Sequence, residues 1–206
     1  MNLTQLGASA VTITAHKIGG PFGVGALIVD PDIKPTPILH GGGHEREIRS
    51  GTLDAAGIAS FAVAVRHAVE QQAAFASRVQ ALRNNLIERV LVAVPAARLN
   101  GESDLTSDQR LPANAHFTFD ECEGDALLML LDAAGIDCST GSACTAGIPE
   151  PSHVLLAMGA EPRASRGSLR FSLGSNSTLA DVDRLLEVLP GAVNRASRAG
   201  QVRSRS

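Results

Sequence analysis

Aromatic residues and cysteines are scarce in this sequence, and long apolar runs are missing. Tryptophan and tyrosine are absent and phenylalanine occurs six times, so the core must consist mainly of Leu, Val, Ile and Ala. With three cysteines and no CxxC pair, the sequence favours neither a disulfide framework nor a Cys-only zinc site, and we expect no metal. No stretch approaches the roughly 20 apolar residues of a membrane span. The N-terminus also lacks a secretory signal, so we expect a cytoplasmic protein that does not engage a membrane.

A surplus of charge of either sign is missing as well. The formal net charge is -3, with 19% charged and 44% hydrophobic residues, which is typical of a soluble globular protein. This balance provides no general attraction to nucleic acid, and we expect no direct nucleic-acid partner. The arginines after residue 194 are scattered among Ser, Gly and Ala, which favours a flexible tail over residues 195–206.

Predicted strands and helices alternate along the chain. Patterns of β-branched or alternating apolar residues predict strands at 11–14, 26–29, 90–94, 115–119 and 169–173. Helical patterns occur at 53–91, 123–134, 152–158 and 178–189, the last of which opens with a capping box. The first is long for one helix, so we expect a bend or a helix pair, followed by a polar loop at 95–112. The alternation predicts an α/β or α+β fold with a boundary near residue 80.

Lys17 follows the first predicted strand, next to His16 and before a glycine-rich turn over 19–25. A lysine at the end of a strand can have its amine desolvated, which suits a Schiff base with a carbonyl group. An ordinary surface lysine is the alternative. The turn carries G-x-x-G-x-G, which matches neither the dinucleotide-binding fingerprint nor the P-loop and is better explained as a plain turn.

A polar, basic loop over 41–52 precedes the first predicted helix. His44 and Glu45 begin the zinc-protease pattern H-E-x-x-H, but Ile48 stands where the second histidine is required. Hydroxyl groups such as that of Thr52, together with backbone N–H groups at a helix N-terminus, can hold a phosphate. A hydrophilic connector is the alternative.

Cys144 and Arg170 are the candidates in the second half of the chain. Cys144 has only small or hydroxyl-bearing neighbours, so a mobile loop can carry its thiol into a pocket and out again. A passive loop thiol is the alternative. Arg170 lies between apolar residues of a predicted strand, where a charged side chain needs a partner. Its guanidinium can grip a carboxylate with two hydrogen bonds or form a structural salt bridge.

The order of these motifs resembles that of the cysteine desulfurases over residues 3–189. Residues 14–27 resemble the segment in which that family attaches pyridoxal 5'-phosphate (PLP) to a lysine, and 41–53 resemble the block that follows it. Ser142-Ala143-Cys144, 151–155 and 169–174 resemble the remaining blocks, in the manner of the NifS/IscS-like group rather than the SufS-like group.

The resemblance implies the C-terminal part of a PLP-dependent transferase of fold type I. Residues 1–80 would belong to the large, PLP-binding sheet domain. Residues 81–194 would form the small α+β domain, which carries the Cys144 loop.

The resemblance also implies how the cofactor is held. Lys17 would attach PLP and later act as acid and base at the substrate Cα. His16 and Thr14 would hold the cofactor phosphate from one subunit, and Thr52 would hold it from the neighbouring subunit. A homodimer is therefore implied.

For the substrate, the resemblance implies that Arg170 binds the carboxylate of L-cysteine. Cys144 would take the substrate sulfur as a persulfide, and L-alanine would leave. A sulfur acceptor or an iron–sulfur scaffold protein would then receive the sulfur for iron–sulfur cluster assembly.

The family's enzymes have a further half before the lysine, with the groups that contact the PLP ring. We therefore expect a cysteine desulfurase fragment that is active alone or together with a complementary N-terminal half. A catalytically incompetent remnant or binding module is the alternative hypothesis. A lyase resembling selenocysteine lyase is a narrower one, and substrate preference distinguishes it.

Overall fold

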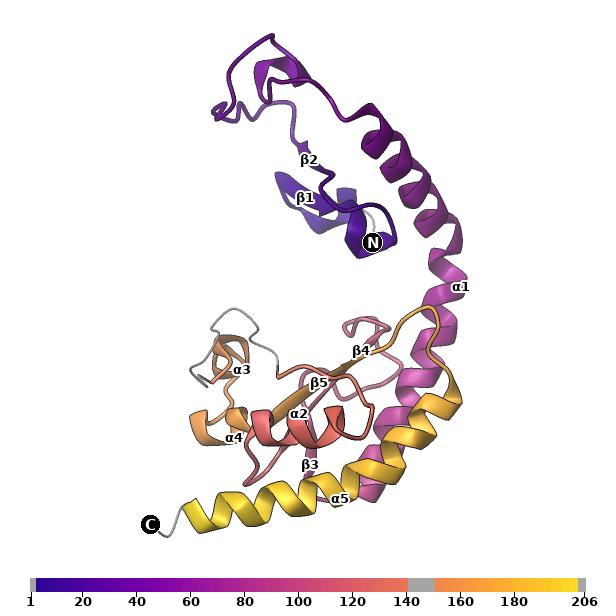
Figure 1. The fold of residues 1–206 in the computed structure, drawn as a ribbon, viewed down its shortest axis with the longest axis vertical. Coiled ribbons are helices and arrows are strands. Elements are labelled where there is room, and N and C mark those ends of the chain that lie inside the picture. Colours follow the sequence, from indigo (N-terminus) through magenta and orange to yellow (C-terminus); the bar gives the residue numbers. More distant parts are fainter. Residues whose placement is uncertain (1–2, 141–150, 204–206) are drawn as a thin grey trace. The chain divides into compact units, whose positions relative to one another are not determined.

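The computed structural model describes residues 3–140 and 151–203 (Figure 1). The chain divides into two compact units, Met1–Ala73 and Ala74–Ser206. The division falls inside helix α1 (Ala55–Ala93), which contributes residues to both units. The sequence places a boundary near residue 80, inside the same helix. No helix in the described part of the chain combines the length and apolarity needed to cross a bilayer.

The first unit consists of a β-hairpin and short 3-10 turns, followed along the chain by the N-terminal part of α1. Its elements are η1 (Leu3–Leu6), β1 (Ala10–Thr14), η2 (Ala15–Ile18), β2 (Gly25–Val29) and η3 (Glu45–Glu47). Strands β1 and β2 are antiparallel, with Thr14 opposite Gly25. Ala15, Phe61 and Ala64 are buried. The predicted strands at 11–14 and 26–29 are therefore confirmed.

The turn between β1 and β2 is closed by backbone hydrogen bonds and by the small size of Gly20. The N–H of Ala15 donates to the carbonyl of Val24 at 3.0 Å, and the N–H of Gly20 donates to the carbonyl of Ala15 at 2.8 Å. A Cβ at Gly20 would lie 3.0 Å from the Cβ of Ala64 in α1. The turn can therefore approach the helix this closely because residue 20 has no side chain.

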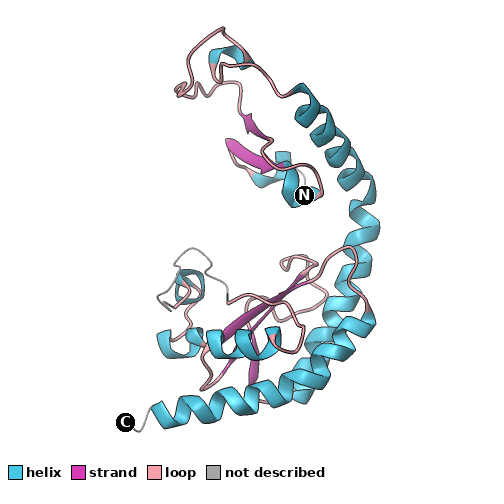
Figure 2. Ribbon diagram, in the orientation of Figure 1, coloured by secondary structure: helices cyan, strands magenta, loops and turns pink. Residues whose placement is uncertain are grey.

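The second unit packs helices against an antiparallel sheet in the order β3-β4-β5 (Figure 2). Its elements after α1 are β3 (Ala97–Leu99), β4 (Asn114–Phe119), α2 (Gly124–Asp132), α3 (His153–Ala157), α4 (Pro162–Arg166), β5 (Ser168–Ser172) and α5 (Leu179–Arg203). One core joins the sheet to α1, α2 and α5, and its members include Leu86, Val90, Phe117, Leu127, Leu169, Val182 and Leu189. The chain thus buries its aliphatic residues around three phenylalanines that lie close together, Phe117, Phe119 and Phe171.

Local signals in the sequence predict several of these elements correctly. The helix α5 opens with the expected reciprocal cap, in which Thr178 N–H donates to Asp181 Oδ2 at 2.8 Å and Asp181 N–H donates to Thr178 Oγ1 at 3.4 Å. Ser152 caps α3 by accepting from the N–H of Leu155. The predicted strands at 115–119 and 169–173 are confirmed as β4 and β5.

Three predictions are wrong, and tertiary packing explains each of them. Residues 55–93 form one helix of 39 residues, and Val90 continues a buried helical stripe instead of starting a strand at 90–94. The predicted loop at 95–112 contains β3, whose residues pair with the end of β4. Helix α5 runs on to Arg203, so residues 195–203 are helical and not a flexible tail. Buried Ala192, Val193 and Ala196 anchor this part of α5.

Replacing Gly167 by alanine is expected to destabilise the second unit. A Cβ at residue 167 would lie 2.7 Å from the carbonyl oxygen of Cys122 and closer still to that of Phe119, and both are backbone atoms that cannot swing aside. We expect the Gly167→Ala variant to lose about 3 kcal/mol of unfolding free energy, the upper range for overpacking. Urea unfolding followed by circular dichroism measures the change.

The control is Gly191→Ala, in the middle of α5, where nothing lies within 4 Å of the added Cβ. Alanine there should raise stability by about 0.5–1 kcal/mol because glycine is a poor helix former. Equal effects of the two substitutions would contradict the close packing inferred around Gly167.

Candidate active site

Thr14, His16 and Lys17 lie on one turn of the first unit, where β1 ends and η2 begins. Thr14 Oγ1 and His16 Nδ1 form a hydrogen bond of 2.9 Å. The His16 ring stacks on Phe22, with ring centres 5.5 Å apart and an interplanar angle of 21°. A hydroxyl, an imidazole and an amine are therefore presented within four consecutive residues.

Lys17 is exposed in this structure. The described residues of the first unit therefore do not provide the desolvation that the sequence suggests for its amine. The chain has only two lysines, and the other, Lys34, is exposed on the proline-rich connection after β2. Any chemistry that needs a lysine amine of this chain must use one of these two side chains.

The loop at 39–54 is fixed by its own backbone before α1 begins. Ser50 is buried, donates its N–H to the carbonyl of Leu39 at 3.2 Å, and accepts the N–H of Gly43 on Oγ at 3.3 Å. Glu45, Arg46 and Glu47 have φ values of 50°, 58° and 64°, in the left-handed region that non-glycine residues rarely adopt. This loop is thus held in an unusual conformation.

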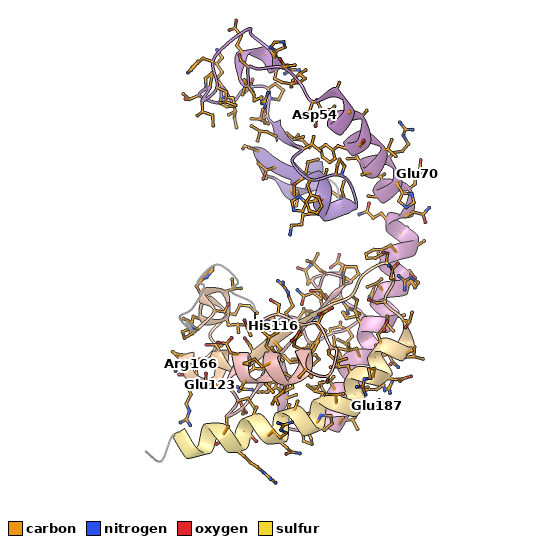
Figure 3. All side chains as sticks on the ribbon, in the orientation of Figure 1. Asp54, Glu70, His116, Glu123, Arg166 and Glu187 are labelled. Carbon is orange, nitrogen blue, oxygen red and sulfur yellow. The ribbon has the colours of Figure 1, made fainter. Side chains whose placement is uncertain are left out.

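Thr52 is exposed between that loop and the start of α1. The carboxylate of Asp54 already accepts the N–H of Gly57 at 3.0 Å, so it caps the first turn of α1 (Figure 3). An anionic cap at this helix N-terminus disfavours a phosphate there, and the Thr52 hydroxyl as a phosphate ligand stays a prediction.

Arg170 lines a cavity of about 350 Å³ in the second unit. Strand β5 carries Arg170, β4 carries Asn114 and His116, and α3 contributes an apolar wall. The residues that line it include Asn100, Glu102, Arg110, His116 and Arg170. A cationic group that is exposed beside an apolar wall can bind the carboxylate of a small amphipathic molecule.

Buried arginines hold the loop over 100–113 that forms the rim of this cavity. Arg110 donates to the backbone carbonyls of Asn100 and Glu102. Arg83, fully buried in α1, donates to the carbonyls of Leu105 and Leu111, both at 3.1 Å. Burial lowers the pKa of both guanidinium groups. The two guanidinium groups therefore hold the loop in place through hydrogen bonds to its backbone carbonyl oxygens.

His116, labelled in Figure 3, lies on β4. In the β4–β5 ladder its partner is Arg170. Burial, followed by the charges of Arg170 and Arg110, lowers the pKa of its imidazole. The ring is consequently neutral at pH 7. The sequence did not single out His116, Asn100 or Arg110. The one available signal was a histidine between apolar residues of a strand.

The lowered pKa of His116 predicts a loss of stability in mild acid. An unfolded histidine titrates near pH 6.5, about its ordinary value. Between that value and the lower pKa in the fold, the unfolded chain binds more protons, so the unfolding free energy falls as the pH falls. Urea unfolding at several pH values between about 7.5 and 5 should show this slope. His116→Gln, which cannot titrate, should flatten it, and an unchanged slope would contradict the assignment.

The two described cysteines are poor candidates for a nucleophile. Burial, then the carboxylates of Glu121, Asp120 and Glu123, raises the pKa of Cys122 to about 11. Burial, then Asp137 and Asp132, raises that of Cys138 to about 11 as well. Both are therefore protonated thiols at neutral pH. Cys144, the predicted nucleophile, lies outside the described residues.

The chain belongs to the class-V aminotransferase family, whose sequence profile, described as Aminotransferase class-V, matches residues 1–185. One curated relative is the IscS-like cysteine desulfurase of Mycobacterium tuberculosis, 56% identical over 94% of this chain and 48% of the relative. Another is cysteine desulfurase IscS 1 of Archaeoglobus fulgidus, 40% identical over 95% of this chain and 50% of the relative. The chain thus spans about half the length of the curated relatives it matches.

Solved structures agree with this assignment. The NifS-like protein of Rickettsia africae superimposes with a TM-score of 0.79 and 29% identity, over 94% of this chain and 50% of that one. A structure described as SspA in complex with cysteine has a TM-score of 0.58 and 27% identity, over 84% of this chain and 46% of that one. The predicted fold class is therefore confirmed.

Proposed function

We propose that the chain forms half of a PLP-dependent cysteine desulfurase, which removes sulfur from L-cysteine and releases L-alanine. One observation supports the proposal most strongly. The exposed amine of Lys17 lies directly after Thr14 and His16, whose side chains are hydrogen-bonded to each other on the same turn. The names of the relatives from Mycobacterium tuberculosis and Archaeoglobus fulgidus support the same activity.

The chemistry of the turn fits PLP, which has an aldehyde, a phosphate and an aromatic ring. The exposed amine of Lys17 can attach the aldehyde. Of the hydrogen-bonded pair Thr14 and His16, the group that accepts in their shared bond is the imidazole or the hydroxyl, and that group keeps a free N–H or O–H that can donate to a phosphate oxygen. When bound, PLP supplies an electron sink for the substrate carbons. Thr52 would hold the phosphate from a second subunit, so the proposed enzyme is a homodimer.

The remaining roles fall to Lys17, Arg170 and Cys144. Arg170, which lines the cavity of the second unit, would bind the carboxylate of L-cysteine and orient it. Lys17 would move a proton at the substrate Cα. The Cys144 thiolate would attack the substrate sulfur, so that the carbon–sulfur bond breaks and a persulfide forms on Cys144. A cytoplasmic sulfur acceptor, such as an iron–sulfur scaffold protein, would receive that sulfur.

Cofactor binding and sulfide release together test the proposal. The purified chain is mixed with PLP, with and without the part of the Mycobacterium tuberculosis relative that lies outside the match. We expect PLP absorbance bound to the protein, and sulfide from L-cysteine in the presence of a reductant, when both parts are present. Absence of both signals from the mixture would contradict the proposal and favour a binding module without activity. Preference for selenocysteine would favour the lyase.

A further inference from the structure

His116 and Arg170 form a cross-strand pair of the non-hydrogen-bonded kind. They are directly opposite each other in the β4–β5 ladder. Arg170 uses its N–H and its carbonyl to bond Ser139, at 2.7 and 3.1 Å, and His116 gives its carbonyl to the N–H of Asn100 at 2.8 Å. Their backbone groups therefore point away from each other, as in a non-hydrogen-bonded pair. In such a pair the side chains approach most closely, and here both line the same cavity.

The side-chain amide of Asn100 contacts the Nδ1 nitrogen of His116. Its Nδ2 lies 2.8 Å from Nδ1 of His116, and an amide nitrogen can only donate, so Nδ1 accepts. The same Nδ2 donates to Thr118 Oγ1 at 2.8 Å, and Asn100 Oδ1 accepts from the Thr118 hydroxyl at 3.2 Å. The backbone carbonyl of Asn100 accepts from Arg110 at 2.7 Å. With Asn100 Nδ2 as the donor, a neutral His116 ring carries its hydrogen on Nε2.

The charges around the ring favour an anion at this place. Arg170 faces His116 from β5, and Arg110 faces it from the loop over 100–113, where Glu102 also lines the cavity. Arg110 already donates to two carbonyls, whereas Arg170 is exposed. A guanidinium and a neutral N–H donor on adjacent strands match the two oxygens of one carboxylate.

We propose that His116 is a specificity-determining residue, whose Nε2–H binds the same carboxylate as the guanidinium of Arg170. The proposal rests on the proposed function, in which that carboxylate belongs to the amino-acid substrate. Arg170 supplies the charge. His116 adds a directional donor that fixes the position of the carboxylate and favours carboxylates over uncharged isosteres.

Nuclear magnetic resonance of the 206-residue chain with labelled histidines tests this with L-alanine as the probe. Adding L-alanine should shift the Nε2 and Hε1 signals of His116, while His67 in the first unit serves as an internal control. L-Alaninamide, which has no carboxylate, should leave His116 unchanged. A His116 signal that does not respond to L-alanine, although other signals of the second unit do, overturns the proposal without any substitution.

Variants measure how much the donor contributes. His116→Phe keeps an aromatic ring but removes the N–H, and we expect the Kd for L-alanine to rise about tenfold, as for a lost hydrogen bond to a charged group. His116→Gln keeps a side-chain N–H donor and should retain most of the affinity. Unchanged affinity in folded His116→Phe overturns the proposal.

Arg170→Ala separates this proposal from the proposed function. If Arg170→Ala abolishes L-alanine binding while His116→Phe does not, the role of His116 is wrong and the substrate site stands. If neither substitution weakens binding, or the unmodified chain binds no L-alanine, the carboxylate site is wrong and both proposals lose their support.

Discussion

Replacing Lys17 by alanine is expected to abolish attachment of PLP to the chain and all turnover that depends on it. The chain has two lysines, and only Lys17 follows a strand end next to Thr14 and His16. Borohydride reduction of the protein with PLP, followed by peptide mapping, should find the cofactor on the peptide of Lys17. In the Lys17→Ala variant this modified peptide should disappear, and sulfide release should fall to background.

Lys34→Ala is the matched control. Its amine is also exposed, so a difference between the two variants cannot come from accessibility. We expect Lys34→Ala to keep both the modified peptide and the activity. Cofactor found mainly on Lys34 in the unmodified protein would refute the assignment of Lys17.

The Cys144→Ala variant is expected to keep PLP bound but to form no persulfide. In the proposed reaction the sulfur of L-cysteine must pass to a thiolate of the protein. The chain has three cysteines, and the thiols of Cys122 and Cys138 stay protonated at neutral pH, which leaves Cys144. The pKa of each of these two is raised to about 11, so at pH 7 the thiolate fraction is about a hundredfold lower than at the usual pKa of 9.0. Mass spectrometry after exposure to L-cysteine should show the added sulfur only when Cys144 is present.

Cys138→Ala tests the specificity of this result. Cys138 is half-buried and lies six positions before Cys144 in the sequence, and its removal should leave persulfide formation intact. A persulfide that persists in Cys144→Ala and vanishes in Cys138→Ala would show that the nucleophile has been assigned to the wrong thiol.

Signals within a few residues made part of this structure predictable. The β-branched run ending at Thr14 forms β1, and the cap formed by Thr178 and Asp181 begins α5 where the sequence indicates. Ser152 likewise begins α3. These features depend on backbone preferences and on hydrogen bonds between residues a few positions apart. Both follow from residue types that can be read directly from the sequence.

The candidate site was predictable only in part. Lys17, His16 and Thr14 could be recognised because they are adjacent in the chain and match the order of family motifs. His116 and Asn100 could not, because they meet only when β3 pairs with β4, where Asn100 directly follows β3 and donates its N–H to the His116 carbonyl. A histidine in a strand carries no sign of the arginine that will lie opposite it.

By itself, the sequence determined the family, the strand and helix starts that local hydrogen bonds specify, and the turn that carries Lys17. Only the tertiary structure decided the length of α1 and α5, the strand β3, and the neutral state of His116 beside Arg170. The physical reason is that burial and electrostatics act between residues far apart in the chain. A side chain's packing and its pKa are therefore set by neighbours that only folding brings together.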